Sequence, residues 1–196
     1  MRMKEINQLD ILIENLEESG LIPMVSVVNK SALFPSQNTF ASSTTVKASL
    51  SDSIFFLARA NVSTSFTGIY SSIELPLEAE YKVYKRNWFD FLLLPKRQKV
   101  GVKYIDDKLT IISPKWIPSK EINLHNAKLF IDLFNSGKPY KLIIENNYLF
   151  SLIEELDNKK VIGIEVEDWL YDKDDLKNLF NIGEELITNI KNSIMF

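Results

Sequence analysis

The spacing of apolar residues predicts a helix at each end of the chain. Residues 4–19 show an apolar stripe at helical spacing, and Gly20 follows where a residue in the left-handed conformation would end the helix. This stripe consists of Ile6, Leu9, Ile13 and Leu16. A longer helix is predicted to begin at Asp172, which we expect to cap it, and to run through Ser193. Its apolar side consists of Leu176, Leu179, Phe180, Gly183, Ile187, Ile190 and Ile194.

The middle of the chain, residues 54–112, has the pattern of a β-sheet. It is rich in Ile, Val, Phe, Tyr and Thr, and residues 81–85 show the alternation of a strand. The triplet Asp106-Asp107-Lys108 separates two strand-like runs, KVGVKYI and KLTIIS, and therefore predicts a hairpin turn. An earlier strand is predicted at residues 21–28, because LIPMVSVV is short and β-branched.

Residues 36–53 have the weakest pattern of all. This segment is dominated by Ser and Thr and carries one charge of each sign. Ser and Thr hydroxyls offer the backbone alternative hydrogen bonds, which favours turns or an edge strand. We therefore expect residues 36–50 to be the most mobile part of the chain.

The last third of the chain alternates between strand and helix patterns. A helix is predicted over residues 122–135, and strands are predicted at 140–145 and 161–167 with a short helix between them. The order strand, helix, strand, helix over residues 140–194 indicates a unit joined to a parallel or mixed sheet.

Together these patterns predict the α+β class. We expect a mostly antiparallel central sheet (about residues 54–112) with an N-terminal helix and a C-terminal strand–helix–strand–helix unit packed on it. The length of 196 residues fits one domain, 1–196, since domains seldom exceed about 250 residues. The second choice is a boundary near residues 113–121, where ISPKWIPSKE interrupts the β pattern.

The composition removes most kinds of catalytic centre. There is no Cys, which excludes disulfides, thiolate zinc sites, iron–sulfur clusters and Cys nucleophiles. The single His, His125, has no partner nearby in sequence with which to act as a base or a metal ligand. Phosphate-binding loops and dinucleotide fingerprints are missing as well. We therefore expect no catalytic residue, no cofactor and no bound metal.

An enzyme that relies on carboxylates and hydroxyls is an alternative, because two carboxylates suffice for glycoside hydrolysis. Adjacent acids such as Glu154 and Glu155 do not indicate one, since neighbouring helix positions diverge by about 100°. A pocket with two acids about 5–10 Å apart would favour the enzyme.

Charge is distributed unevenly along the chain, which the net charge of −3 hides. Residues 82–103 carry seven cations against Asp90, a net charge of +6. Residues 145–185 carry twelve acids against four lysines, a net charge of −8. Regions of opposite charge and this size steer the approach of charged partners at low salt.

The basic region interleaves cations with aromatic residues and is the one candidate binding surface. Its members are Lys85, Arg86, Trp88, Phe89, Lys96, Arg97 and Lys99. This pattern is typical of an anionic-membrane surface or of a nucleic-acid surface, but also of a buried strand, Trp88 to Leu94, with charged ends. A pI of about 5.4 argues against nucleic acid. Whether Trp88, Phe89 and Phe91 are buried separates these interpretations.

The expected location is cytoplasmic. No run of about 18 apolar residues is present, and acids interrupt the N-terminal helix where a signal peptide would be uniformly apolar. The lack of catalytic groups and the charge asymmetry favour a non-enzymatic cytoplasmic protein that binds a protein partner, another copy of the chain included. The alternatives are a peripheral membrane or lipid-binding domain that uses residues 84–97, and a carboxylate-dependent enzyme.

Overall fold

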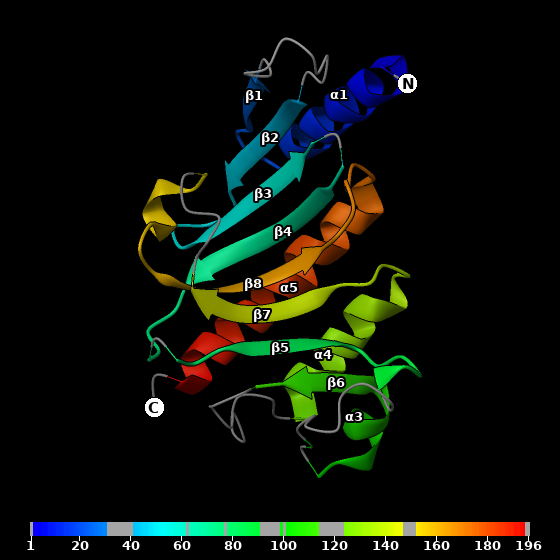
Figure 1. Cartoon of the computed structure of the whole chain (residues 1–196), viewed down its shortest axis with the longest axis vertical. Coiled ribbons are helices and arrows are strands. Elements are labelled where there is room, and N and C mark those ends of the chain that lie inside the picture. The colour runs from blue at the N-terminus through cyan, green and yellow to red at the C-terminus, as the bar shows by residue number, and fades with distance from the viewer. Residues whose placement is uncertain are drawn as a thin grey trace, which may run out of the picture.

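Eight strands form one antiparallel sheet in the part of the chain that the structure describes (Figure 1). The structure is a computed structural model and describes residues 2–30, 41–61, 63–76, 78–90, 99, 101–113, 124–146 and 152–194. The strand order is β1-β2-β3-β4-β8-β7-β5-β6, and every neighbouring pair is antiparallel. The strands are β1 (Met24–Lys30), β2 (Ala41–Ser49), β3 (Ile54–Ala60), β4 (Ser65–Ser72), β5 (Tyr81–Lys85), β6 (Leu109–Ile112), β7 (Lys141–Asn146) and β8 (Lys160–Val166).

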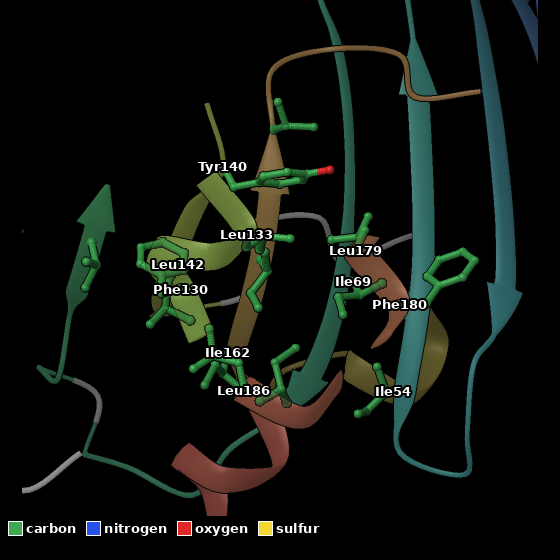
Figure 2. Packing of buried hydrophobic residues seen from close by; sticks show 14 of the residues in the cluster. Ile54, Ile69, Phe130, Leu133, Tyr140, Leu142, Ile162, Leu179, Phe180 and Leu186 are labelled. Carbon is green, nitrogen blue, oxygen red and sulfur yellow. The ribbon is translucent and has the colours of Figure 1, made fainter. Parts of the chain in front are cut away.

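Three helices of the described chain cover one face of the sheet, the far face in Figure 1. They are α1 (Arg2–Glu18), α4 (Leu124–Asn135) and α5 (Lys173–Ile194). Their apolar stripes meet the inward side chains of the strands in the main core, as for Ile69, Leu142, Phe130 and Leu179 (Figure 2). Helix α5 comes so close to the sheet at Gly183 that a Cβ there would lie 2.7 Å from Cδ1 of Ile69.

A smaller core lies on the opposite face. Sheet residues such as Leu57 and Tyr70 pack there against Ile153 and Leu156, at the short 3₁₀ helix η1 (Glu154–Leu156). The fully buried ring of Tyr70 lies against Gly163, the residue opposite it on β8. A Cβ on this glycine would lie 2.5 Å from Cδ1 of Tyr70, so the ring needs a glycine beneath it.

The predicted α+β class is confirmed, with an antiparallel sheet and a helix at each end. The sheet is larger than the predicted range of residues 54–112, because β1, β2, β7 and β8 also belong to it. Strands β7 and β8 lie between β4 and β5. They pair directly and antiparallel, with Lys141 opposite Glu165, so the chain reverses between them and does not cross over the sheet. The prediction of a parallel or mixed arrangement here is therefore wrong.

The prediction of turns or an edge strand for residues 36–53 holds for residues 50–53, which form the turn between β2 and β3, and is wrong for residues 41–49. Residues 41–49 form β2, which pairs with β1 on one side and β3 on the other. Thr is β-branched and suits a strand, and Val46 and Ala48 alternate so that both are buried in the main core. Mobility was predicted because these residues were expected to bury little and to pair poorly. Strand β2 is hydrogen-bonded to a strand on each side, so that reason does not apply to residues 41–49. Residues 36–40 lie outside the described residues.

The hairpin turn predicted at Asp106-Asp107-Lys108 is also wrong. Residues Lys103–Lys108 form the short helix α3, and β6 begins directly after it and pairs with β5. Gly101 has a φ of 84°, a left-handed conformation that interrupts an extended chain. The run KVGVKYI is therefore not a strand, and Ile105 is the buried residue that attaches α3 to the core.

The helix predictions are confirmed to within two residues for α1, α4 and α5. Asp172 caps α5 as expected, since its Oδ1 accepts hydrogen bonds from the backbone N–H groups of Asp174 (2.9 Å) and Asp175 (3.3 Å). The single domain stays a prediction. Its alternative boundary near residues 113–121 lies, apart from Ser113, outside the described residues.

Candidate binding surfaces

The turn that follows β5 exposes two aromatic side chains. Trp88 is 69% exposed and Phe89 is 51% exposed, and their ring centroids lie 3.8 Å apart. The segment that begins α3 exposes two further large apolar residues, Val102 and Tyr104. We call the described residues 85–90, 99 and 101–108 the aromatic tip. It lies at the β6 end of the sheet, the end opposite to β1 (Figure 1).

Four exposed lysines accompany these apolar side chains in the aromatic tip. They are Lys85, Lys99, Lys103 and Lys108. The Nζ atom of Lys108 lies 4.6 Å from the centroid of the Tyr104 ring and donates a hydrogen bond to its hydroxyl at 3.3 Å. Aromatic rings and lysine side chains are therefore presented together at this end of the molecule.

Arg86 holds the two halves of the aromatic tip together. Its backbone N–H donates to the carbonyl of Lys108 at 2.8 Å, and its Nη1 donates to the carbonyl of Asp106 at 3.2 Å. A longer ion pair of 4.0 Å links Nη1 to the exposed carboxylate of Asp107. The guanidinium thus binds groups of the protein itself. Arg86 therefore positions the aromatic tip more than it offers a free charge to a partner.

Asp90 anchors the base of the turn. It is 5% exposed, and its carboxylate accepts hydrogen bonds from Tyr84 Oη (3.1 Å), Thr110 Oγ1 (2.7 Å) and the backbone N–H of Asn87 (3.0 Å). Burial disfavours the charged carboxylate, but these hydrogen bonds and the nearby Arg86 charge outweigh it and hold the pKa of Asp90 below its ordinary value. Burial and the Asp90 carboxylate raise the pKa of Tyr84 to about 12.

The buried-strand interpretation of residues 88–94 is wrong for its first two residues, because Trp88 and Phe89 are exposed in a turn. Lys85 and Lys99 are exposed as a binding surface requires. Phe91, Lys96 and Arg97 lie outside the described residues.

A second apolar surface lies at the other end of the sheet, on and beside β1. Its exposed members are Ile22, Met24, Val25, Val27 and Val28. The sequence predicted a strand here but not its exposure, because an isolated run of β-branched residues looks the same whether it lies in the middle or at the edge of a sheet.

A cleft of about 280 Å³ opens between the start of β1 and η1. Met24, Phe55 and Ile153 supply apolar walls, and Glu154 and Glu155 are the acids that line it. Both glutamates are exposed and adjacent in sequence. They do not form the facing pair of acids that would favour the carboxylate-dependent enzyme.

Glu165 is a partly buried acid on the smaller-core face, and its burial has a structural role. Burial raises the pKa of Glu165, although Tyr70 Oη donates a hydrogen bond to its Oε2 at 3.0 Å. This bond gives the hydroxyl of the buried Tyr70 side chain a hydrogen-bond acceptor. His125 is exposed on α4, with its Nε2 3.4 Å from Oε1 of Glu185 on α5, a partner far away in sequence.

Comparison with known proteins finds no match to this chain among protein families, curated proteins or solved structures. Among the described residues, no helix is long and apolar enough to cross a bilayer. In the part of the chain that the structure describes, the aromatic tip and the surface on and beside β1 are the two exposed apolar surfaces on which a partner could bind.

Proposed function

We propose that this is a cytoplasmic peripheral membrane protein whose aromatic tip binds bilayers containing anionic lipids. The observation that carries the proposal is the exposure of Trp88 and Phe89 in a turn that follows the exposed Lys85 and is hydrogen-bonded through Arg86 to α3, which carries the exposed Lys103 and Lys108. Side chains of this kind are usually buried, and exposed apolar clusters mark interaction sites.

The chemistry of the aromatic tip matches an anionic bilayer in two ways. Trp, Tyr and Phe rings favour the boundary between lipid headgroups and acyl chains, where the apolar body of the ring leaves water. Lysines beside them face the negative headgroups, and each basic residue near such a surface contributes about 1 kcal/mol. The two acids of α3 oppose this only in part, because Arg86 pairs with Asp107 and the carboxylate of Asp106 accepts the N–H of Gly101.

The geometry favours lipid over nucleic acid. Bases bind by stacking on the free faces of aromatic rings. Trp88 and Phe89 already cover one face of each other at 3.8 Å, Lys108 lies over the Tyr104 ring, and Val102 has no flat face to offer. Insertion into lipid needs only that these side chains protrude, which they do.

Vesicle sedimentation tests the proposal. Wild-type protein should sediment with phosphatidylserine-containing vesicles at low salt, and much less at high salt or with phosphatidylcholine alone. Replacing Lys85, Lys99 and Lys103 together with Ser should lower the partition coefficient roughly a hundredfold, since about 3 kcal/mol is lost. The double substitution Trp88→Ser and Phe89→Ser should also abolish binding.

Matched variants elsewhere on the surface provide the controls. The exposed lysines Lys128, Lys159 and Lys177 can be replaced with Ser to give the same change of net charge. Ile22→Ser removes an exposed apolar side chain that lies outside β1 at the opposite end of the sheet. Wild-type protein that ignores anionic vesicles at low salt would overturn the proposal. So would equal losses in the tip and control variants, or binding to a single-stranded oligonucleotide without binding to vesicles.

A further inference from the structure

Strand β1 has an outer edge with no neighbour in the described residues. It stands first in the strand order, and all seven of its residues pair with β2 on the inner side. Its large side chains are exposed on both faces: Met24 (55%), Val25 (43%), Val27 (55%) and Val28 (49%). A strand edge of this kind presents unpaired N–H and C=O groups between apolar side chains.

The two edge strands of the described sheet, β1 and β6, differ in how well they are protected from pairing with a further strand. Strand β6, at the opposite end, has only four residues, and Leu109, Thr110 and Ile111 are buried. Shortness is one way in which proteins protect a sheet edge from pairing. Residues 24–29 of β1 are longer than that and carry no charge and no proline. Apart from Lys30 at its end, β1 therefore shows, within the described residues, none of the features that discourage a further strand.

We propose that β1 is a self-association surface, on which β1 of a second copy of this chain pairs antiparallel about a two-fold axis at Val27. The occupant of an open strand edge must itself be a strand with apolar side chains on both faces, and β1 is such a strand. Pairing about Val27 uses all seven residues. It continues the antiparallel order of the sheet, so that two eight-stranded sheets join edge to edge.

The charges of β1 are compatible with this pairing. Lys30 is its only charged residue, and a two-fold axis at Val27 places it opposite Met24 of the partner subunit. The two lysines lie at opposite ends of the paired strands, so no like charges face each other. Val25 lies opposite the buried Val46 within one copy, which puts Val25 and Val27 on the helix-covered face. The pairing keeps that face on the same side in both copies, and Val27 then packs against Val27 of the partner subunit.

The absence of cysteine from the chain permits a direct test. In two-fold antiparallel pairing only the residue on the axis faces itself, at the Cα separation of about 4.5–5.5 Å that a disulfide accepts. Under mild oxidation of the full chain, Val27→Cys should form a covalent dimer at least tenfold faster than Ile22→Cys or Lys128→Cys. Both controls sit at exposed positions off the axis.

Sedimentation equilibrium provides the second measurement. The mass of wild-type protein should rise with concentration from 22.6 kDa towards twice that value. Val27→Lys should stay monomeric at every concentration with an unchanged melting temperature, because Val27 is exposed in the monomer. A wild type that is monomeric throughout, or thiols that cross-link equally fast at all three positions, would overturn the proposal. A Val27→Lys protein that still dimerises would overturn it too, since another surface would then be responsible.

Discussion

Replacing Asp90 with Ala should destabilise the protein and disorganise the aromatic tip together. The substitution removes the acceptor of three hydrogen bonds, from Tyr84 Oη, Thr110 Oγ1 and the backbone N–H of Asn87. Thr110 is fully buried, so its hydroxyl cannot turn to water instead. Hydrogen bonds to a charged group contribute about 1.5–3 kcal/mol each, but removing the charge also relieves the cost of burying it. We expect a net loss of about 2–4 kcal/mol of unfolding free energy.

The effect of Asp90 should depend on pH. The folded protein holds the pKa of Asp90 below its ordinary value of 3.8. A carboxyl group whose pKa is lower in the folded protein than in the unfolded chain stabilises the fold at pH values above its pKa in the unfolded chain. This contribution is lost as the pH falls through the pKa that the group has in the folded protein. The difference in unfolding free energy between wild type and Asp90→Asn should therefore be constant near neutral pH and should shrink below about pH 3.8.

Urea unfolding measures both effects, with vesicle sedimentation on the same samples. A loss of about 3 kcal/mol should move the unfolding midpoint by roughly 1–2 M urea. Asp107→Ala is the matched control, because that carboxylate is 60% exposed and its contact within the described residues is the 4.0 Å ion pair with Arg86. It should stay within about 0.5 kcal/mol of wild type. If Asp90→Ala is as stable as this control, Asp90 does not anchor the turn. If it is destabilised but still binds vesicles as tightly as wild type, Asp90 does not position Trp88 and Phe89.

Two further substitutions test the packing. Gly163→Ala should cost about 1–3 kcal/mol, because the new Cβ would lie 2.5 Å from the buried ring of Tyr70, and it should cost less in a Tyr70→Leu background. A double-mutant cycle measures this coupling, and strictly additive losses would contradict it. Asp172→Ala should cost about 0.5–2 kcal/mol by removing the cap of α5, and Asp174→Ala should cost less, since the Asp174 side chain makes no capping bond in the described structure. Thermal melts of the two variants decide this, and equal losses would count against the cap.

The candidate binding surface was predicted in part. The sequence shows aromatic residues and cations interleaved around Trp88, but the same residue pattern is also typical of a buried strand with charged ends. Exposure of Trp88 and Phe89 follows from the end of β5 at Lys85 and from the anchoring of Asp90 by Thr110, twenty residues further along. The role of Arg86 is likewise a long-range contact, with the carbonyl of Asp106. No local pattern encodes such partners.

The helices could be predicted from the spacing of residues alone. The spacing of apolar residues predicted α1, α4 and α5 closely, because a helix satisfies its backbone hydrogen bonds within one segment and needs only an apolar stripe and a cap such as Asp172. It also determined the α+β class and the strands with the strongest alternation. Strand neighbours, by contrast, were decided only by the tertiary structure, since a strand makes its hydrogen bonds with segments distant in sequence. That is why the predicted parallel or mixed arrangement of β7 and β8 was wrong, why turns or an edge strand were expected for the Ser- and Thr-rich residues of β2, and why the position of β1 at the edge of the described sheet was not predicted.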